Sequence, residues 1–201
     1  FNEDLAAMPL GAGYNLYSPA APTASAAFPD LGLLVHRLPT SGVTNPSTLV
    51  DHASLNDRPD QIVLVTQNWN PQDVPASIGV YNNSIVTLQY FADQRWRIAN
   101  VSGNPLPNGA AFNVYAQPPS PSAFHHVVEA GNRIGTGTLI SHPLIDGISC
   151  ARIQVTSIFG AGEYDVYYDT ARSRWTIFGV SSMPLGSRFN VLFSPRQIFD
   201  C

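Results

Sequence analysis

Phe112-Asn113-Val114-Tyr115 returns later in the chain as Phe189-Asn190-Val191-Leu192, and each copy follows a Pro-x-Gly turn. The residues before these two segments also match, in the same order along the chain. The matching pairs are residues 48–52 with 138–142, Val65-Thr66 with Val155-Thr156, and residues 95–98 with 174–177. A repeat of this length predicts two copies of one small module rather than a single large catalytic domain.

A third copy of the terminal segment opens the chain, where Tyr14-Asn15-Leu16-Tyr17 follows Met8-Pro9-Leu10-Gly11. We expect residues 8–17 to form a strand placed like residues 106–115 and 183–192. Its candidate assembly side chains are Met8, Tyr14, Leu16 and Tyr17, because an apolar strand without a module of its own can pair with an open sheet edge. The expected organisation is an orphan strand at 1–19, repeats at 28–117 and 124–194, and a tail at 195–201.

The composition narrows the class of protein. Hydrophobic residues make up 44% of the chain, which is enough to build cores, but charged residues make up only 12%. The net charge is −4 and the chain contains no lysine, so it lacks the clustered cations that binding to nucleic acid requires. No apolar stretch approaches the ~20 residues that span a bilayer. Low charge and frequent proline favour a secreted, extracellular or cell-surface protein.

Two cysteines, Cys150 and Cys201, can form one disulfide. In a secreted chain, pairing is favoured over free thiols. Closing a loop of this length within the chain would stabilise the fold by about 4 kcal/mol. The sequence leaves open whether the bond forms within one chain or between two chains.

The secondary structure is predicted to be strand throughout. Residues 61–67 and 151–157 form short apolar or alternating runs, and residues 165–169 and 174–178 are separated by a turn, which predicts a hairpin. No window sustains a helical period, so we predict an all-β fold of two tandem, small antiparallel sandwiches or barrel-like modules. The first repeat is longer, and its extra residues are expected to include a hairpin or loop at 82–93.

Four segments carry a family resemblance: residues 65–71, residues 78–82, Arg95-Trp96-Arg97-Ile98, and residues 107–114. Together they resemble a β-rich domain of unknown function that occurs, often in tandem, in secreted and cell-surface bacterial proteins. The resemblance extends more loosely over residues 138–193. It implies the fold and the location, but it implies no activity and no cofactor.

The histidines and carboxylates favour structural roles. His52 and His142 occupy matching places in the two repeats, which predicts a shared turn hydrogen bond or a strand-end contact. The neighbours His125 and His126 should point to opposite faces of a strand, and they lack the spacing of a metal site. Calcium-like oxygen sets occur at Asp57 and Asp60 and at Asn2-Glu3-Asp4, but neither has a calcium-loop spacing. We therefore assign no metal.

Aromatic and amide residues suggest a ligand site. Trp96 and Trp175 recur in both repeats and are predicted to be core residues. Gln67, Asn68, Trp69 and Asn70 place an indole among amides in the first repeat only, and such a combination suits sugar recognition. Asn82 and Asn100 each fit the glycosylation acceptor pattern.

Three functions follow from this sequence. The first is a non-catalytic extracellular structural or adhesive protein, which self-assembles into a filament or surface layer through strand sharing or end-to-end contacts. The alternative is a carbohydrate-binding module that uses Trp69 and its neighbouring amides. A secreted hydrolase comes third, because the chain has no Gly-x-Ser-x-Gly nucleophile motif.

Overall fold

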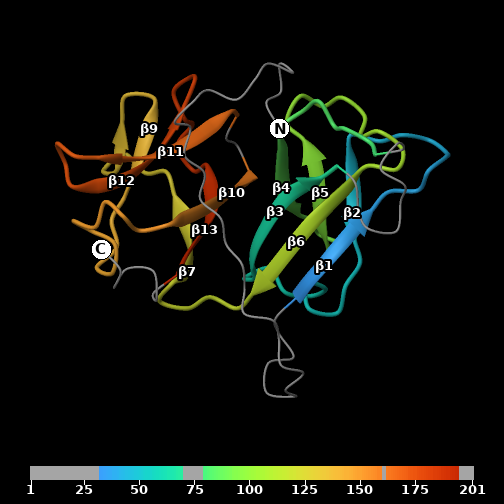
Figure 1. Ribbon diagram of the computed structural model, residues 1–201, viewed down its shortest axis with the longest axis horizontal. Coiled ribbons are helices and arrows are strands. Elements are labelled where there is room, and N and C mark those ends of the chain that lie inside the picture. Colours follow the sequence, from blue (N-terminus) through green and yellow to red (C-terminus); the bar gives the residue numbers. More distant parts are fainter. Residues whose placement is uncertain (1–31, 70–78, 160–161, 195–201) are drawn as a thin grey trace.

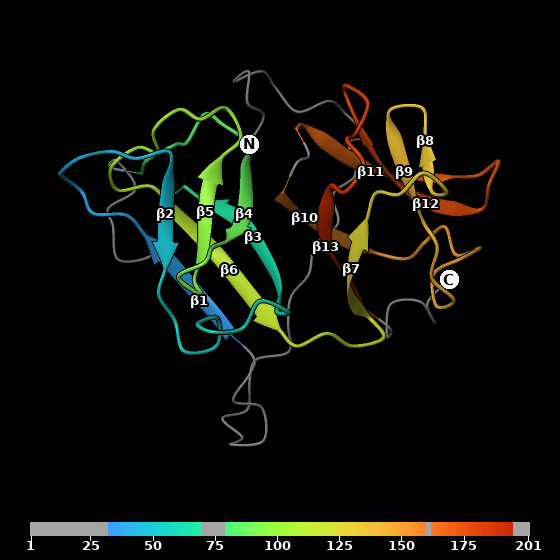
Figure 2. The same ribbon diagram turned by 180° about the vertical axis from the view of Figure 1, so that it is seen from behind.

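The computed structural model describes residues 32–69, 79–159 and 162–194, and these residues form strands and turns without any helix. They build two small sandwiches that lie side by side (Figures 1 and 2). The strands of the first are β1 (Gly32–Arg37), β2 (Ser47–Val50), β3 (Ile62–Asn68), β4 (Val86–Tyr90), β5 (Trp96–Asn100) and β6 (Ala111–Gln117). Those of the second are β7 (Ala123–Val127), β8 (Arg133–Ile134), β9 (Gly137–Ile140), β10 (Ile153–Phe159), β11 (Tyr164–Asp169), β12 (Arg174–Gly179) and β13 (Arg188–Phe193).

Each sandwich consists of two antiparallel sheets. The first pairs the strands in the orders β1-β6-β3 and β2-β5-β4, and the second in the orders β10-β13-β7 and β11-β12-β9-β8. The inward residues of the two sheets meet in one core per sandwich, with Phe112 and Ile98 in the first and Phe189 and Ile177 in the second. Successive side chains of a strand point to opposite faces, so every second residue of a strand can face the core. The predicted all-β, tandem-sandwich fold is confirmed.

The sequence repeat is also a structural repeat. Trp96 and Trp175 are buried, and their Nε1 atoms donate to the carbonyl oxygens of Arg58 (3.0 Å) and Ile148 (2.9 Å), respectively. A buried indole needs an acceptor for its N–H group. Both indoles therefore fill a core position and also hold a loop through this hydrogen bond. Their predicted core role is confirmed.

A second matched pair links the two sheets inside each sandwich. His36 Nε2 lies 2.9 Å from Thr48 Oγ1, and His126 Nε2 lies 2.8 Å from Thr138 Oγ1. Burial lowers the pKa of His36, and it lowers the pKa of His126 to about 4. These histidines are therefore neutral near pH 7.

The longer first repeat differs from the expectation in one place. Its extra residues lie in the connection between β3 and β4, over residues 69–85, whereas the connection between β10 and β11 covers only residues 160–163. The hairpin or loop expected at 82–93 contains strand β4 (Val86–Tyr90), which pairs with β5 as the first arm of a hairpin. Because β11 pairs with β12 in the same way in the second sandwich, only residues 82–85 of this range belong to the extra connection. The alternation of Val86, Leu88 and Tyr90 is the signal for this strand.

Several predictions fall outside the described residues. They are the orphan strand with Met8, Tyr14, Leu16 and Tyr17, the oxygen set Asn2-Glu3-Asp4, Asn70, Cys201, and the tail at 195–201. The disulfide between Cys150 and Cys201 therefore stays a prediction. Within the described part of the chain, no helix is long and apolar enough to cross a bilayer.

Candidate functional site

The two sandwiches meet through a contact that contains hydrogen bonds from side chains to the main chain. β3 is the edge strand of its sheet, so its outward main-chain groups need partners from elsewhere. Side chains of the second sandwich supply them: Thr156 Oγ1 accepts from Val65 N at 3.2 Å, and Asn190 Nδ2 donates to Val63 O at 2.8 Å. The second sandwich thus binds the backbone of an edge strand through side chains rather than through another strand.

His125 extends this row of contacts. Its Nε2 lies 3.3 Å from the carbonyl oxygen of Asp60, in the turn before β3. A carbonyl oxygen can only accept, so this nitrogen carries the proton. Burial lowers the pKa of His125, and the nearby charge of Arg188 lowers it further. The neutral imidazole therefore acts here as a hydrogen-bond donor. His126 points to the other face of β7, as the sequence predicted.

Apolar contacts join the sandwiches on either side of these hydrogen bonds. Ile62 and Leu64 pack against Ala123 and Leu192 in a small shared cluster. Ile158 of β10 belongs to the core of the first sandwich rather than to that of its own. It reaches that core beside β4, where the Thr87 hydroxyl donates to the Ser157 carbonyl oxygen at 3.1 Å.

The same face of the first sandwich is open. Four residues of the first sandwich match in sequence the positions of the second sandwich that bind β3: Leu33, Val35, Thr66 and Asn113. We call these four residues the open face. All four are exposed, and Leu33 and Val35 are 60% and 52% exposed. Their counterparts Ala123, Thr156 and Asn190 are buried at the contact between the sandwiches. The first sandwich therefore carries the same Thr and Asn side chains without a strand across them in the described structure.

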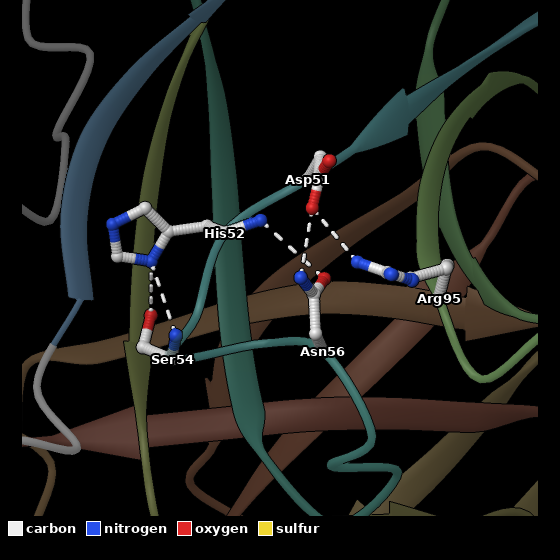
Figure 3. Close-up of polar contacts among 5 residues, drawn as sticks. All are labelled: Asp51, His52, Ser54, Asn56 and Arg95. Carbon is white, nitrogen blue, oxygen red and sulfur yellow. Dashed lines mark hydrogen bonds and ion pairs between the residues drawn. The ribbon is translucent and has the colours of Figure 1, made fainter.

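His52 lies in a polar cluster in the turn after β2 (Figure 3). Its Nδ1 accepts from Ser54 N at 3.2 Å and lies 2.6 Å from Ser54 Oγ. Asp51 does not reach the imidazole in this cluster: its Oδ1 accepts from Asn56 and from Arg95, each at 2.7 Å. The Asn56 hydrogen bond, and then the Arg95 charge, lower the pKa of Asp51.

The second sandwich repeats this turn with different side chains. Leu144 N donates to His142 Nδ1 at 3.3 Å, and His142 N donates to Asp146 Oδ1 at 3.0 Å. Arg174 lies 3.3 Å from the same carboxylate. Since a hydroxyl is absent at position 144, the element common to both turns is the imidazole that accepts a main-chain N–H. The predicted turn hydrogen bond at His52 and His142 is confirmed.

The predicted ligand site around Trp69 is largely engaged within the protein. When the Gln67 amide is oriented to match its partners, its nitrogen donates to Asn82 O at 3.1 Å and its oxygen accepts from Asn82 N. Asn68 Nδ2 donates to Asn113 Oδ1 at 2.9 Å. The half-buried indole of Trp69 packs on Gly79, where an added Cβ would lie 2.6 Å from Trp69 Cε2.

The glycosylation prediction does not fit the folded chain. Asn82 and Asn100 are buried, and their amides bond each other through Asn82 Nδ2 to Asn100 Oδ1 at 2.8 Å. Asn82 Nδ2 also donates to Ser84 O at 2.9 Å, and Asn100 Nδ2 donates to Asn104 O at 2.9 Å. Both acceptor nitrogens are therefore inside the fold, because the amide pair closes the loops around β4 and β5. The short sequence motif carries no information about burial.

Metal ligands do not gather in the described part of the chain: no group of three or more His, Cys, Asp or Glu side chains could hold an ion there. Asp57 sits in a tight turn with φ of 61° and donates its N–H to Gln94 O at 3.0 Å. The matching residue of the second sandwich is Gly147, with φ of 78°. The shared left-handed backbone explains the residue type at Asp57, since Asp and Asn tolerate this conformation better than most side chains.

Comparison with known proteins identifies one family. A family model described as a domain of unknown function (DUF7452) matches residues 1–90 and again residues 87–193. No curated protein and no solved structure matches the chain. The two matched segments agree in number with the internal repeat, and they meet at residues 87–90, within strand β4 of the first sandwich.

Proposed function

We propose that this chain, which belongs to the DUF7452 family of domains of unknown function, is a non-catalytic, extracellular structural protein that self-assembles end to end. The observation that carries this proposal is the open face. In the second sandwich the equivalent face binds an edge strand through Thr156 and Asn190. A face built in the same way on the first sandwich offers the same mode of contact to a sandwich from another molecule.

The physical argument rests on open-ended assembly. When one surface of a molecule binds a different surface of the next copy, the assembly stays open-ended unless the rotation between successive copies closes a ring. The two sandwiches of this chain already meet through such a contact, because β3 of one meets β10, β13 and β7 of the other. Leu33 and Val35 add exposed apolar surface, whose burial stabilises a contact by about 25 cal/mol per Å².

Catalysis has weaker support. The closest arrangement to a nucleophile and base is Ser54 with His52, but Ser54 is only 4% exposed. Its hydroxyl and its N–H both face the same imidazole nitrogen, which is the geometry of a turn. Carbohydrate binding through Trp69 also has weaker support, since the amides of Gln67 and Asn68 are bonded within the protein.

Sedimentation velocity of the whole chain over about a hundredfold range of concentration tests the proposal. We expect larger species to appear with rising concentration, and Val35→Glu to abolish them by placing a charge on the open face. Val43→Glu is the matched control, because Val43 is 89% exposed in the loop between β1 and β2 and is not part of the open face. A chain that stays monomeric at every concentration would sink the proposal, as would equal effects of the two substitutions.

A further inference from the structure

The outer face of the β11-β12-β9-β8 sheet carries a groove of about 500 Å³ in the second sandwich. We call it the β12 groove. Its lining includes Tyr167, Thr176 and Phe178 on the strands, Arg172 in the turn between β11 and β12, and Thr136 between β8 and β9. Ligand pockets in proteins have volumes of ~300–1,000 Å³, so the β12 groove is large enough for a small molecule.

Two aromatic rings form the apolar part of this groove. Tyr167 is 43% exposed and Phe178 is 37% exposed. Their ring centroids lie 5.3 Å apart with an interplanar angle of 77°. An edge-to-face pair of this kind holds both rings in place. The groove thus has a fixed aromatic surface rather than flexible apolar chains.

Polar groups of two kinds lie beside the rings. Thr176 is completely buried, and its hydroxyl has no hydrogen-bond partner in the described structure. Buried hydroxyls are normally bonded, and Thr176 is one of the residues that line the groove, so a bound molecule is a candidate for the missing partner. Arg172 Nη1 is held by Asp169 Oδ2 at 2.6 Å. This bond fixes the guanidinium and balances its charge, while its other N–H groups remain as donors.

The first sandwich lacks this set of side chains. Gln89 pairs with Arg97 there as Tyr167 pairs with Thr176 in the second sandwich. Arg97 fills that face, since its guanidinium lies 4.3 Å from the centroid of the Phe91 ring and bonds Asp93. Two copies of one scaffold need the same core, so side chains that differ between them on one outer face are candidates for a separate function.

Gly137 forms part of the groove wall for a steric reason. A Cβ at this position would lie 2.6 Å from the carbonyl oxygen of Ile177. Only glycine therefore lets the β8–β9 hairpin approach β12 so closely. Ser47 pairs with Ala99 at the matching place in the first sandwich. Among the described residues, the β2-β5-β4 sheet of the first sandwich has no strand that corresponds to β8, so the hairpin wall belongs to the second sandwich.

We propose that the β12 groove binds a neutral sugar ring, with the ring's C–H face on Tyr167 and its hydroxyls on Thr176 and Arg172. A sugar combines an apolar face with several hydroxyls, and the groove combines aromatic rings with an unpaired hydroxyl and N–H donors. The charge of Arg172 is balanced by Asp169, which favours a neutral ring over an anion. This site is distinct from the open face and from Trp69.

A printed array of neutral and carboxylated glycans, followed by NMR titration of the whole chain with the best neutral oligosaccharide, tests the site. We expect saturable shifts at the amides of Gly135, Gly137 and Tyr167. Tyr167→Ala should weaken binding roughly tenfold through loss of the aromatic contact. Gln89→Ala, at the matching position of the first sandwich, should leave binding unchanged.

A second variant separates binding from folding. Thr176→Val removes the unpaired hydroxyl but keeps the side-chain shape, so the melting temperature should stay the same or rise. Sugar affinity should fall by about twofold to tenfold, because one hydrogen bond is lost. The proposal is overturned if no neutral glycan gives saturable shifts up to about 10 mM, if carboxylated glycans alone bind, or if Trp69→Ala rather than Tyr167→Ala removes binding.

Discussion

Asn190 lies completely buried between the two sandwiches, where its Nδ2 donates to Val63 O at 2.8 Å. Replacing it by alanine leaves this carbonyl oxygen buried without its partner, because β3 is an edge strand with no neighbouring strand on that side among the described residues. A buried polar group that loses its hydrogen bond costs about 1–3 kcal/mol. No described residue bonds Asn190 Oδ1, so the removal of this oxygen offsets part of the cost.

The expected net loss in the free energy of unfolding is therefore about 1–2 kcal/mol. For a chain of this size, each kcal/mol lowers the melting temperature by about 2–4 °C. Asn190→Ala should thus lower it by about 2–8 °C. Differential scanning calorimetry measures this fall directly, and a weakened contact should also broaden or split the transition if the two sandwiches begin to unfold separately.

Asn113→Ala is the matched control, since Asn113 holds the same position in the first sandwich but is exposed on the open face. Its loss should change the free energy of unfolding by less than about 0.5 kcal/mol in the monomer. Equal destabilisation by the two substitutions would refute the reasoning, because it would mean that the contact with Val63 contributes nothing beyond a common strand effect. An unchanged melting temperature for Asn190→Ala would refute it as well.

Three further predictions concern the cores and the buried histidine. Ile158→Ala should lower the free energy of unfolding, measured in urea, by about 2–4 kcal/mol, because Ile158 fills the core of the other sandwich. Leu185 is exposed, so Leu185→Ala is the control. A loss for Ile158→Ala as small as that for Leu185→Ala would contradict the prediction. Asn100→Ala should cost about 2–4 kcal/mol, since it breaks the buried pair with Asn82, and a neutral result would show that the pair is dispensable. Between pH 6.5 and about 4 the unfolded chain takes up a proton at His126 that the folded chain excludes, so stability should fall by about 3 kcal/mol as the pH drops through this window. His126→Gln should flatten that part of the stability profile measured by denaturant titration, and an unaltered profile would count against the assignment.

Local patterns predicted much of the fold. The strands around Val65 and Val155, and the hairpin before Trp175, follow from alternation and turn residues that act over a few positions. The matched histidines predicted a shared turn bond, because two copies of one segment fold under the same local forces. The hairpin or loop expected at 82–93 includes strand β4, but the extra residues of the first repeat lie before this strand, in the connection from β3.

The amide residues show where local patterns fail. Asn82 and Asn100 fit an acceptor motif, and Gln67 and Asn68 suggested a ligand site, but all four amides bond within the protein. A side-chain amide can bind a ligand, carry a glycan or form hydrogen bonds within a loop. Which partner it meets depends on residues distant in sequence, as with Asn113 for Asn68 and Asn82 for Gln67.

The sequence by itself determined that the chain is a β-rich tandem repeat with two similar cores, because apolar periodicity and turns are properties of neighbouring residues. Only the tertiary structure decided what the outward faces do. Thr66 and Thr156, and likewise Asn113 and Asn190, are identical residues at matching positions, yet one of each pair is exposed and the other is buried against β3. The physical reason is that an outward side chain gains its partner only when a second sandwich docks on it, and that docking depends on the shapes of both surfaces together.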